Sequence, residues 1–599
     1  MQKRGLWTYP VAALMVSSAC SLSARPSHET EAIAGPMVGH SDPMRRPPAP
    51  PKPQGGGEEF DRVSGVTPTP RPPPPPQLAA VPPSGYAGST DALQNKRFNT
   101  VQVLREQPKA ERNERPDDAT EREVSVGVLA TQYGVNPTIE TTVERFSTFA
   151  ADVDTGSYTL ARAQLQSGSL PPEAAVRVEE FVNAFDYGYH PPEREAFAVQ
   201  VEAFPSPSRK GYHVLHVGVK GREVSAAARA PSNLVFTLDV SGSMQVPNRL
   251  PLAKRAMELL VDQLDERDQV AVVVYGTTAH VVLPMTSATQ RQRIVEAIES
   301  VGNEGSTNVQ AGLELAYDVA LKAFRPGATN RIILCSDGVA NNGITTADGI
   351  FAKVKSRASE GITLTTVGFG MGSYNDALME RLADVGDGHY AYVDRIEEAR
   401  RVFVEQLTGT LQVIAKDVKL QLEFDPDAVE RYRLLGFENR ALAKEDFAND
   451  KVDAGELGAG HAVTAIYEVK FKSRAPSHFA TFRARFKAPQ GHTSMLVEKA
   501  LPMSVVRDGP GEASPPARLS LVAAGFAEKL RGSYWARTLR WEQLESMWAE
   551  LPPSLKGQPR VQELGTLIKT AHRLDTREDR FEKEAPVASM SFDHIPVLR

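Results

Sequence analysis

The sequence predicts an α/β protein: a doubly wound, mainly parallel sheet flanked by a β-rich module and a C-terminal helical region, after a disordered Pro-rich N-terminal tether. Three observations predict this architecture. Apolar runs such as 234–239 and 332–335 alternate with amphipathic helical patterns, as in parallel sheets covered by helices on both faces. Later stretches such as 418–424 alternate with period two, which indicates half-buried strands. Prolines concentrate before residue 125, with five in succession at 72–76.

Composition excludes several classes of protein. The 599 residues carry 68 Lys and Arg against 74 Asp and Glu, a formal charge of −6, so a general nucleic-acid binder with a basic surface is not expected. The two cysteines, Cys20 and Cys335, are too few for a disulfide scaffold or a thiolate-rich zinc site. After the N-terminus no apolar run reaches the roughly 20 residues that span a bilayer.

The N-terminus predicts export. Residues 1–20 read as a signal peptide, with two basic residues, an apolar stretch at 6–16, small residues and then Cys20. The end of this segment resembles a bacterial lipoprotein signal, which implies acylation of Cys20 and a place in the periplasm or at the outer membrane. The alternative is a plain secretory signal cut near Ala19 or Ala24, which would leave the protein secreted without an anchor.

Composition and periodicity divide the rest of the chain. In order, we expect a disordered Pro-rich linker at 21–125, an N-terminal α+β module at 140–225, a central α/β domain at 231–415, a β-rich module at 416–508 and a helical region at 515–575. Strands within 195–219 and 418–486 are expected to form one sandwich that the central domain interrupts. In the first module, Asp154 or Thr155 is predicted to cap a helix.

Three polar segments are expected to converge at one edge of the central sheet. The segments at 239–243 and 336–338 each follow a buried strand, and the segment at 305–308 precedes a helix. Ligands of such sheets bind outside the carboxyl ends of the strands. The candidate metal ligands there are Asp239, Ser241, Ser243, Thr307 and Asp337.

These residue types suit a hard cation. Carboxylates and hydroxyls are typical ligands of Mg²⁺, with Mn²⁺ or Ca²⁺ as alternatives. Asp239 and Asp337 together balance a divalent ion, while neutral hydroxyls add ligands without further negative charge. The alternative is a metal-free relic in which these groups only cap loops. Nearby, Gly368, Gly370 and Gly372 predict a flexible strand-to-helix turn, or else room for another loop to approach the site.

The pattern Asp-x-Ser-x-Ser, followed by Thr and Asp on two further loops, resembles the von Willebrand factor type A domain and its metal-ion-dependent adhesion site. The flanking modules, including a Gly-rich loop at 453–461, resemble a bacterial exported subfamily with an N-terminal module and a C-terminal extension. The resemblance implies a Rossmann-like fold and an ion with an open coordination position. It also implies a protein partner that supplies an acidic residue to that ion.

We therefore predict an envelope-associated binding or assembly protein and not an enzyme. Ser241 or Ser243 as a nucleophile would need a base such as His, and the sequence has no P-loop, no His-Glu-x-x-His and no Cys-x-x-Cys. No nucleic-acid partner is expected, and contact with a membrane is expected only through lipid on Cys20. The alternatives are a metal-dependent hydrolase and a metal-independent structural protein of the envelope.

Overall fold

The computed structural model describes residues 134–338, 347–370, 376–406, 409, 411–452, 454–474, 476–489 and 491–576. The chain divides into two compact units, Met1–Arg97 and Phe98–Arg599, and every described residue belongs to the second. The expected signal peptide, the lipidation site Cys20 and the whole Pro-rich linker at 21–125 lie outside the described residues. Within those residues, no helix combines the length and the apolar character needed to cross a bilayer.

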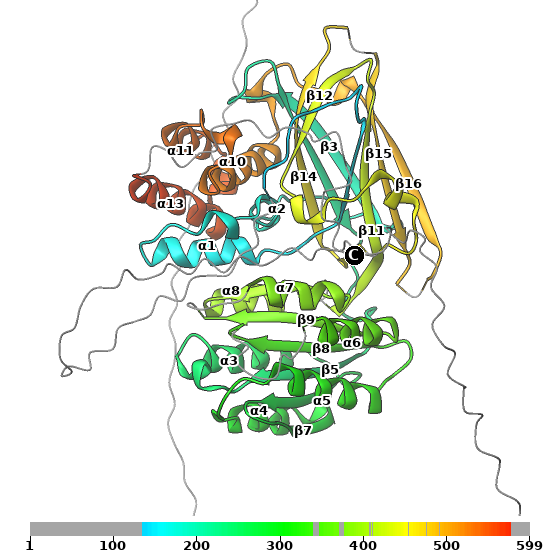
Figure 1. Ribbon diagram of the computed structural model, residues 1–599, viewed down its shortest axis with the longest axis vertical. Coiled ribbons are helices and arrows are strands. Elements are labelled where there is room, and N and C mark those ends of the chain that lie inside the picture. The colour runs from blue at the N-terminus through cyan, green and yellow to red at the C-terminus, as the bar shows by residue number, and fades with distance from the viewer. Residues whose placement is uncertain are drawn as a thin grey trace, which may run out of the picture. The chain divides into compact units, whose positions relative to one another are not determined.

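The central domain contains the predicted doubly wound sheet (Figure 1). Its strand order is β10-β9-β8-β5-β6-β7, and only β7, at one edge, runs antiparallel to its neighbour. In this order the strands are Tyr390–Val393, Ile362–Phe369, Thr329–Ser336, Ser232–Asp239, Gln269–Tyr275 and Ala279–Ser287. Every residue of β5 and β9 is buried, which accounts for their continuous apolar sequence.

Helices cover both faces of this sheet and bury two separate cores. One core joins the sheet to α3 (Leu250–Val261), α4 (Arg291–Ser300) and α8 (Ile396–Arg400). The other joins it to α5 (Val309–Lys322), α6 (Ala347–Ser359) and α7 (Asp376–Val385). Cys335 is fully buried in the first core, as expected of an inert thiol.

The expected β-sandwich is confirmed, and the central domain is inserted into it. One sheet has the order β1-β12-β14-β4-β3, and the other has the order β13-β11-β15-β16 with β2 paired to β11. Strand β4, before the central domain, pairs with β14 after it from Val469↔His213 to Ala462↔Lys220. In chain order the strands are Ile139–Glu140, Phe146–Ala150, Phe197–Pro205, His213–Gly221, Val413–Phe424, Val429–Leu435, Gly455–Gly458, Ala462–Phe471, His478–Lys487 and Ser494–Pro502.

A helical layer packs against one face of the sandwich and extends its core. It combines the early helices α1 (Gly156–Gln166) and α2 (Val178–Asn183) with four late ones, and their buried side chains pack with residues of β3, β4, β12 and β14. The late helices are α10 (Pro515–Leu530), α11 (Trp541–Ala549), α12 (Pro553–Lys556) and α13 (Pro559–Leu574). Trp541, at 8% exposure, lies in this core.

Two local predictions are wrong. Thr155 stands at the N-cap of α1, but neither it nor Asp154 caps the helix, because Thr155 Oγ1 accepts a bond from Arg401 and Asp154 Oδ1 accepts one from the Tyr390 amide. The expected Gly-rich loop at 453–461 contains a short strand, β13, which pairs with β11. Separately, α8 continues after Arg400 into a π-helical turn, Arg401–Glu405.

Candidate functional site

The predicted ligand residues lie on three loops at the carboxyl edge of the central sheet. Asp239 is the last residue of β5, which pairs in parallel with β6 on one side and β8 on the other. Asp337 directly follows β8, and Thr307 lies two residues before α5. Ser241 precedes a 3₁₀ turn, Gly242–Gln245, that contains Ser243. The segment that carries the two serines is thus a tight turn.

Backbone hydrogen bonds hold the first two loops together. The Gly242 amide donates to Gly305 O at 3.0 Å, and the Glu304 amide donates to Val240 O at 2.6 Å. Glycine permits this approach, because a Cβ on Gly305, whose φ is +64°, would lie 2.1 Å from Thr277 Oγ1. Backbone hydrogen bonds therefore fix the two loops relative to each other.

Asp239 is oriented by bonds to both of its carboxylate oxygens. The Ser241 amide donates to Oδ1 and the Ser336 hydroxyl donates to Oδ2, each at 2.9 Å. The side chain is fully buried. Burial, with the nearby charge of Asp337 adding to it, raises the pKa of Asp239 to about 6. A divalent cation at this carboxylate would offset the cost of burying its charge.

The hydroxyl groups fit the same ion. Ser241 Oγ and Ser243 Oγ lie 3.1 Å apart, so both can contact one ion. Thr307 is fully buried, and its Oγ1 has no hydrogen-bond partner among the described residues. A buried hydroxyl without a partner costs about 1–3 kcal/mol, and coordination to a cation would remove that cost. Two carboxylates and three hydroxyls form the oxygen-only donor set that Mg²⁺ prefers.

An arginine that the sequence analysis did not single out also reaches this edge. Arg249, just before α3, donates from Nη1 to Asp337 Oδ2 and to the Ser243 carbonyl, both at 2.7 Å. Gly370, at the end of β9, leaves room for it, since a Cβ there would lie 2.3 Å from Arg249 Cγ. In the sequence, the signal for the approach of Arg249 was Gly370, because its glycine-rich turn indicated room for another loop near the site.

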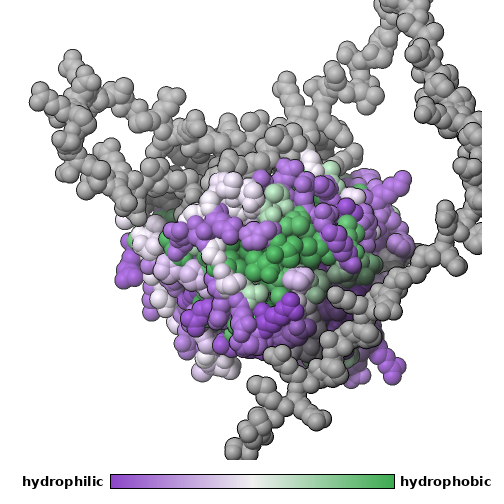
Figure 2. Space-filling model, turned by 90° about the horizontal axis from the view of Figure 1, so that it is seen from below, coloured by the Kyte–Doolittle hydropathy of each residue, from purple (hydrophilic) through white to green (hydrophobic). Residues whose placement is uncertain are grey.

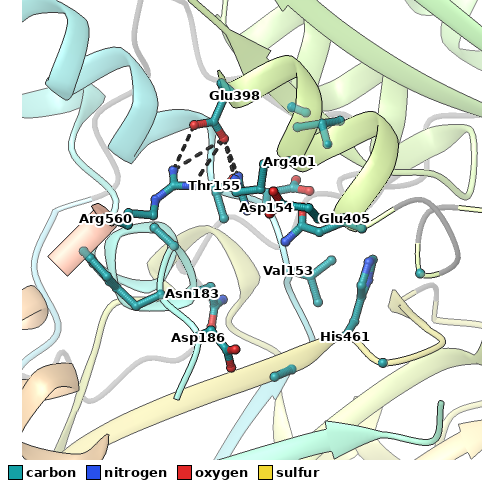
Figure 3. A pocket seen from close by; sticks show the side chains of 18 of the residues that line it. Val153, Asp154, Thr155, Asn183, Asp186, Glu398, Arg401, Glu405, His461 and Arg560 are labelled. Atoms are coloured by element: carbon teal, nitrogen blue, oxygen red, sulfur yellow. Dashed lines mark hydrogen bonds and ion pairs between the residues drawn. The ribbon is translucent and has the colours of Figure 1, made fainter. Parts of the chain in front are cut away.

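A cavity of about 1080 Å³, with several charged side chains in its lining, lies between the central domain, the sandwich and the C-terminal helices (Figure 3). His389 and His461 line it, with ring centroids 5.3 Å apart. His389 Nε2 and His461 Nδ1 are buried and lack hydrogen-bond partners in the part of the chain that the structure describes. Burial lowers the pKa of both imidazoles, to about 4 for His461, so both are neutral near pH 7.

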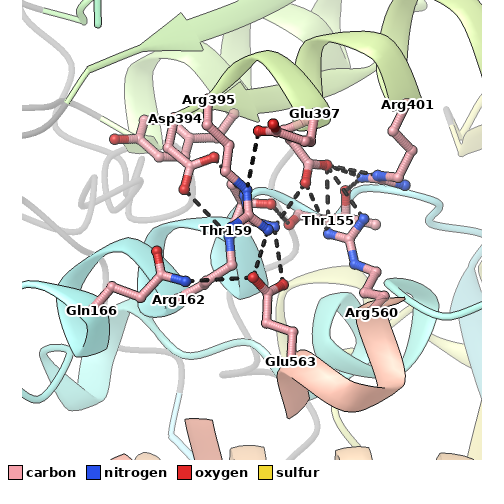
Figure 4. Close-up of polar contacts among 12 residues, drawn as sticks. Thr155, Thr159, Arg162, Gln166, Asp394, Arg395, Glu397, Arg401, Arg560 and Glu563 are labelled. Atoms are coloured by element: carbon pink, nitrogen blue, oxygen red, sulfur yellow. Dashed lines mark hydrogen bonds and ion pairs between the residues drawn. The ribbon is translucent and has the colours of Figure 1, made fainter. Parts of the chain in front are cut away.

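One wall of this cavity is a buried ion-pair network (Figure 4). Arg162 of α1, which is 1% exposed, pairs with Asp394 at 2.5 Å and with Glu398 of α8 at 2.9 Å. Glu398 also pairs with Arg401 at 2.6 Å and with Arg560 of α13 at 3.2 Å. Burial alone would raise the pKa of Glu398, but these arginines hold it well below its usual range. The network joins the central domain to α1, which precedes it in the sequence, and to α13, which follows it.

Comparison with protein families defines the class of protein. The model described as von Willebrand factor type A domain matches residues 233–406, the segment that contains most of the central sheet and the loops at its carboxyl edge. Models described as von Willebrand factor and as the C-terminal part of the uncharacterized protein YfbK match 130–216 and 409–574. This is therefore a von Willebrand factor type A domain protein with a YfbK-like C-terminal region.

The chain belongs to the YfbK family. It is 38% identical over 446 residues to the uncharacterized protein YfbK of Escherichia coli (strain K12), an alignment that covers 70% of this chain and 76% of that protein. A shorter match, 38% over 111 residues, covers 18% of this chain and 19% of the magnesium-chelatase 60 kDa subunit of Rhodobacter capsulatus. Among solved structures, a von Willebrand factor type A protein from Catenulispora acidiphila matches with a TM-score of 0.39 and 16% identity, covering 65% of this chain and 97% of that one.

Proposed function

We propose that this protein is an exported binding protein of the cell envelope that holds a divalent ion at Asp239, Ser241, Ser243, Thr307 and Asp337. The ion, Mg²⁺ in the first instance, would supply an open coordination position for an acidic residue of a protein partner. The observation that carries the proposal is the buried Thr307 hydroxyl, which lacks a hydrogen-bond partner among the described residues and lies on a loop bonded to the one that follows the oriented Asp239. Lipid on Cys20 would tether the protein to a membrane.

A surface next to the site favours a protein partner over a small anion. The turn before β7 is bonded to the loop that carries Thr307, since the Asn308 amide donates to Gly276 O at 3.0 Å. Figure 2 views the molecule from the side on which β7 lies in Figure 1 and shows hydrophobic residues gathered within a hydrophilic surround. On β7, Val281 is 38% exposed, and Ala279 and Met285 are partly buried. A partner held at the ion could cover this surface as well.

Binding is favoured over hydrolysis by the state of Asp239. A metal-dependent hydrolase would need a general base within hydrogen-bond reach of a bound water. Both oxygens of Asp239 are already engaged by Ser241 and Ser336, so this carboxylate is placed to orient a ligand set and not to accept a substrate proton. The hydrolase remains the alternative, as does a metal-independent structural protein.

Calorimetric titration of the full chain carrying Cys20→Ser with Mg²⁺, Mn²⁺ and Ca²⁺ tests the metal site. We expect one ion to bind, and binding to disappear in Asp239→Ala but not in Asp262→Ala, which removes an exposed carboxylate paired with Arg291. The partner step is tested by capturing envelope proteins with and without chelator. Unchanged capture in chelator and with Asp239→Ala would leave the metal-independent structural protein as the better description.

A further inference from the structure

The last strand of the sandwich leaves one edge unpaired. Strand β16 (Ser494–Pro502) ends the sheet order β13-β11-β15-β16 and has β15 as its neighbour on one side only within the described part of the chain. In Figure 1 it forms the outer edge of the sandwich. An edge strand presents free N–H and C=O groups along its length, and proteins usually protect such an edge with charges, bulges or covering segments.

The exposed half of β16 is apolar on both faces. Met495, Leu496 and Val497 are 45%, 49% and 38% exposed. Met495 and Val497 pair with Phe486 and Ala484 of β15, whose side chains are buried in the sandwich core, so these two point toward the core side. Leu496 points to the opposite face. The three apolar side chains therefore lie on both faces of the sheet beside its free edge.

The two charges of β16 do not shield this segment. Glu498 pairs with Arg483 of β15 at 2.6 Å, back across its own sheet. Lys499 Nζ donates at 2.7 Å to the Val199 carbonyl of β3, the edge strand of the opposite sheet. Both charges are thus engaged within the sandwich, while residues 495–497 are left for another strand.

We propose that a second copy of this chain pairs with β16, antiparallel and about a two-fold axis perpendicular to the sheet. The two sandwiches would then share one continuous sheet across the interface. Such an isologous contact uses the same surface on both subunits, and strand addition supplies main-chain hydrogen bonds to both free edges. The proposal does not depend on the metal site.

Face, charge and the pairing of the apolar segment with itself together select the register. A two-fold axis perpendicular to the sheet keeps each face on its own side, so each residue pairs with one of the same face. Centring the axis on Glu498 or Lys499 would oppose like charges, which destabilises cross-strand pairs. Centring it on Leu496 sets Leu496 against Leu496 of the second copy, Met495 against Val497, and Ser494 against Glu498. This register buries the whole apolar segment without opposing like charges.

The contact is small, so we expect reversible association. Strand β16 has 9 residues, against the roughly 20–30 residues a side of a standard interface. Cross-linking can detect such a pair at high protein concentration, because a cysteine at the central position faces its own copy. Directly opposed residues of an antiparallel pair have Cα atoms about 4.5–5.5 Å apart, within the range that a disulfide bridges.

The test is disulfide cross-linking of the full chain in a Cys20→Ser background, in which buried Cys335 is the remaining native cysteine. Under mild oxidation we expect Leu496→Cys to form covalent dimer at least tenfold faster than Glu498→Cys, whose cysteine would face Ser494 of the second copy. Mixing Glu498→Cys with Ser494→Cys chains should restore the fast reaction. Equal rates for the two single variants would overturn the proposed register and the dimer with it.

Sedimentation velocity over a wide concentration range gives an independent readout. We expect the Cys20→Ser chain to show reversible dimer at high concentration, and Leu496→Lys to abolish it. Val143→Lys is the matched control, because Val143 is also an exposed apolar side chain, at 64%, but lies outside β16. A chain that stays monomeric throughout, or that loses association equally in both variants, would mean that another partner or solvent covers this edge.

Discussion

The guanidinium of Arg249 lies 2.7 Å from a carboxylate oxygen of Asp337, and the same nitrogen lies 2.7 Å from the carbonyl of Ser243. The positively charged side chain of Arg249 thus links the loop after β5 to the loop after β8 at the candidate metal site. With Asp239 ionised, the two acids and this arginine carry a formal charge of −1. A divalent ion would therefore enter a site whose charge is already half compensated, which leaves an excess of positive charge for an acidic partner residue.

Removal of Arg249 is expected to tighten ion binding. Arg249→Met keeps an apolar stem of similar length but removes the positive charge that competes for Asp337, and we expect the Kd for Mg²⁺ to fall by on the order of tenfold. Calorimetric titration measures it. Arg255→Met, on the exposed face of α3, controls for loss of an arginine and should leave the Kd unchanged. A weaker site in Arg249→Met would show that its role in fixing the two loops outweighs its charge.

The effect of Thr307→Val on stability is expected to change sign between buffers without and with the metal. In chelator the substitution removes a buried hydroxyl that has no hydrogen-bond partner in the described part of the chain, so it should stabilise the fold by about 1 kcal/mol. With excess Mg²⁺ it removes a ligand, so the metal-dependent rise in Tm should shrink or vanish. Thermal unfolding in the two buffers measures both effects.

Thr237→Val is the matched control for that experiment. Thr237 lies on β5, is fully buried, and its Oγ1 also lacks a hydrogen-bond partner among the described residues. Its substitution should stabilise the protein to a similar extent in both buffers. If the two variants behave alike with Mg²⁺, the Thr307 hydroxyl is not a ligand.

The sequence predicts the central sheet well because its signals are local. Buried parallel strands read as continuous apolar runs, and the segments that hold Asp239 and Asp337 directly follow two of them. The pairing of β4 with β14 joins residues more than 240 positions apart, so period-two alternation suggested a shared sandwich but not its register. Arg249 was missed because its contact with Asp337 depends on how two loops fold. Thr155 was misassigned because Arg401, far away in sequence, takes its hydroxyl.

Stability is expected to fall in mild acid because of His216. This imidazole is 3% exposed and lies between Tyr189 Oη, at 2.7 Å from Nε2, and Ser520 Oγ, at 2.8 Å from Nδ1. Burial lowers its pKa from 6.5 to about 4. Between these pH values the unfolded state binds a proton that the folded state does not, so stability is lost as the pH falls from 6.5 towards 4. The loss from this group should approach about 3 kcal/mol.

His216→Gln removes the titrating group and keeps a polar side chain. It should lower stability at pH 7.5 but flatten the pH dependence of the urea midpoint between pH 6.5 and 4.5. His190→Gln, at an exposed position, serves as the control and should leave the wild-type slope. If the urea midpoint depends on pH equally steeply in His216→Gln and in the wild type, other groups cause the acid sensitivity. Buried His389 and His461 are then the first candidates.

The network around Arg162 is expected to dominate the attachment of the central domain to the helical layer. Arg162→Met leaves Asp394 and Glu398, 8% and 2% exposed at the side chain, without one cation, and breaking a buried pair in this way costs about 3–5 kcal/mol. Glu398 keeps Arg401 and Arg560, so most of the loss should come from Asp394. Asp394→Asn added to Arg162→Met should therefore restore part of the stability, because it removes the stranded charge.

Arg291→Met, which breaks a pair with side chains 52% and 40% exposed, should cost less than about 1 kcal/mol. Urea unfolding followed by tryptophan fluorescence compares them, since Trp541 and Trp548 lie in the helical layer. Equal small losses in Arg162→Met and Arg291→Met would mean that apolar packing, and not this network, holds the layers together.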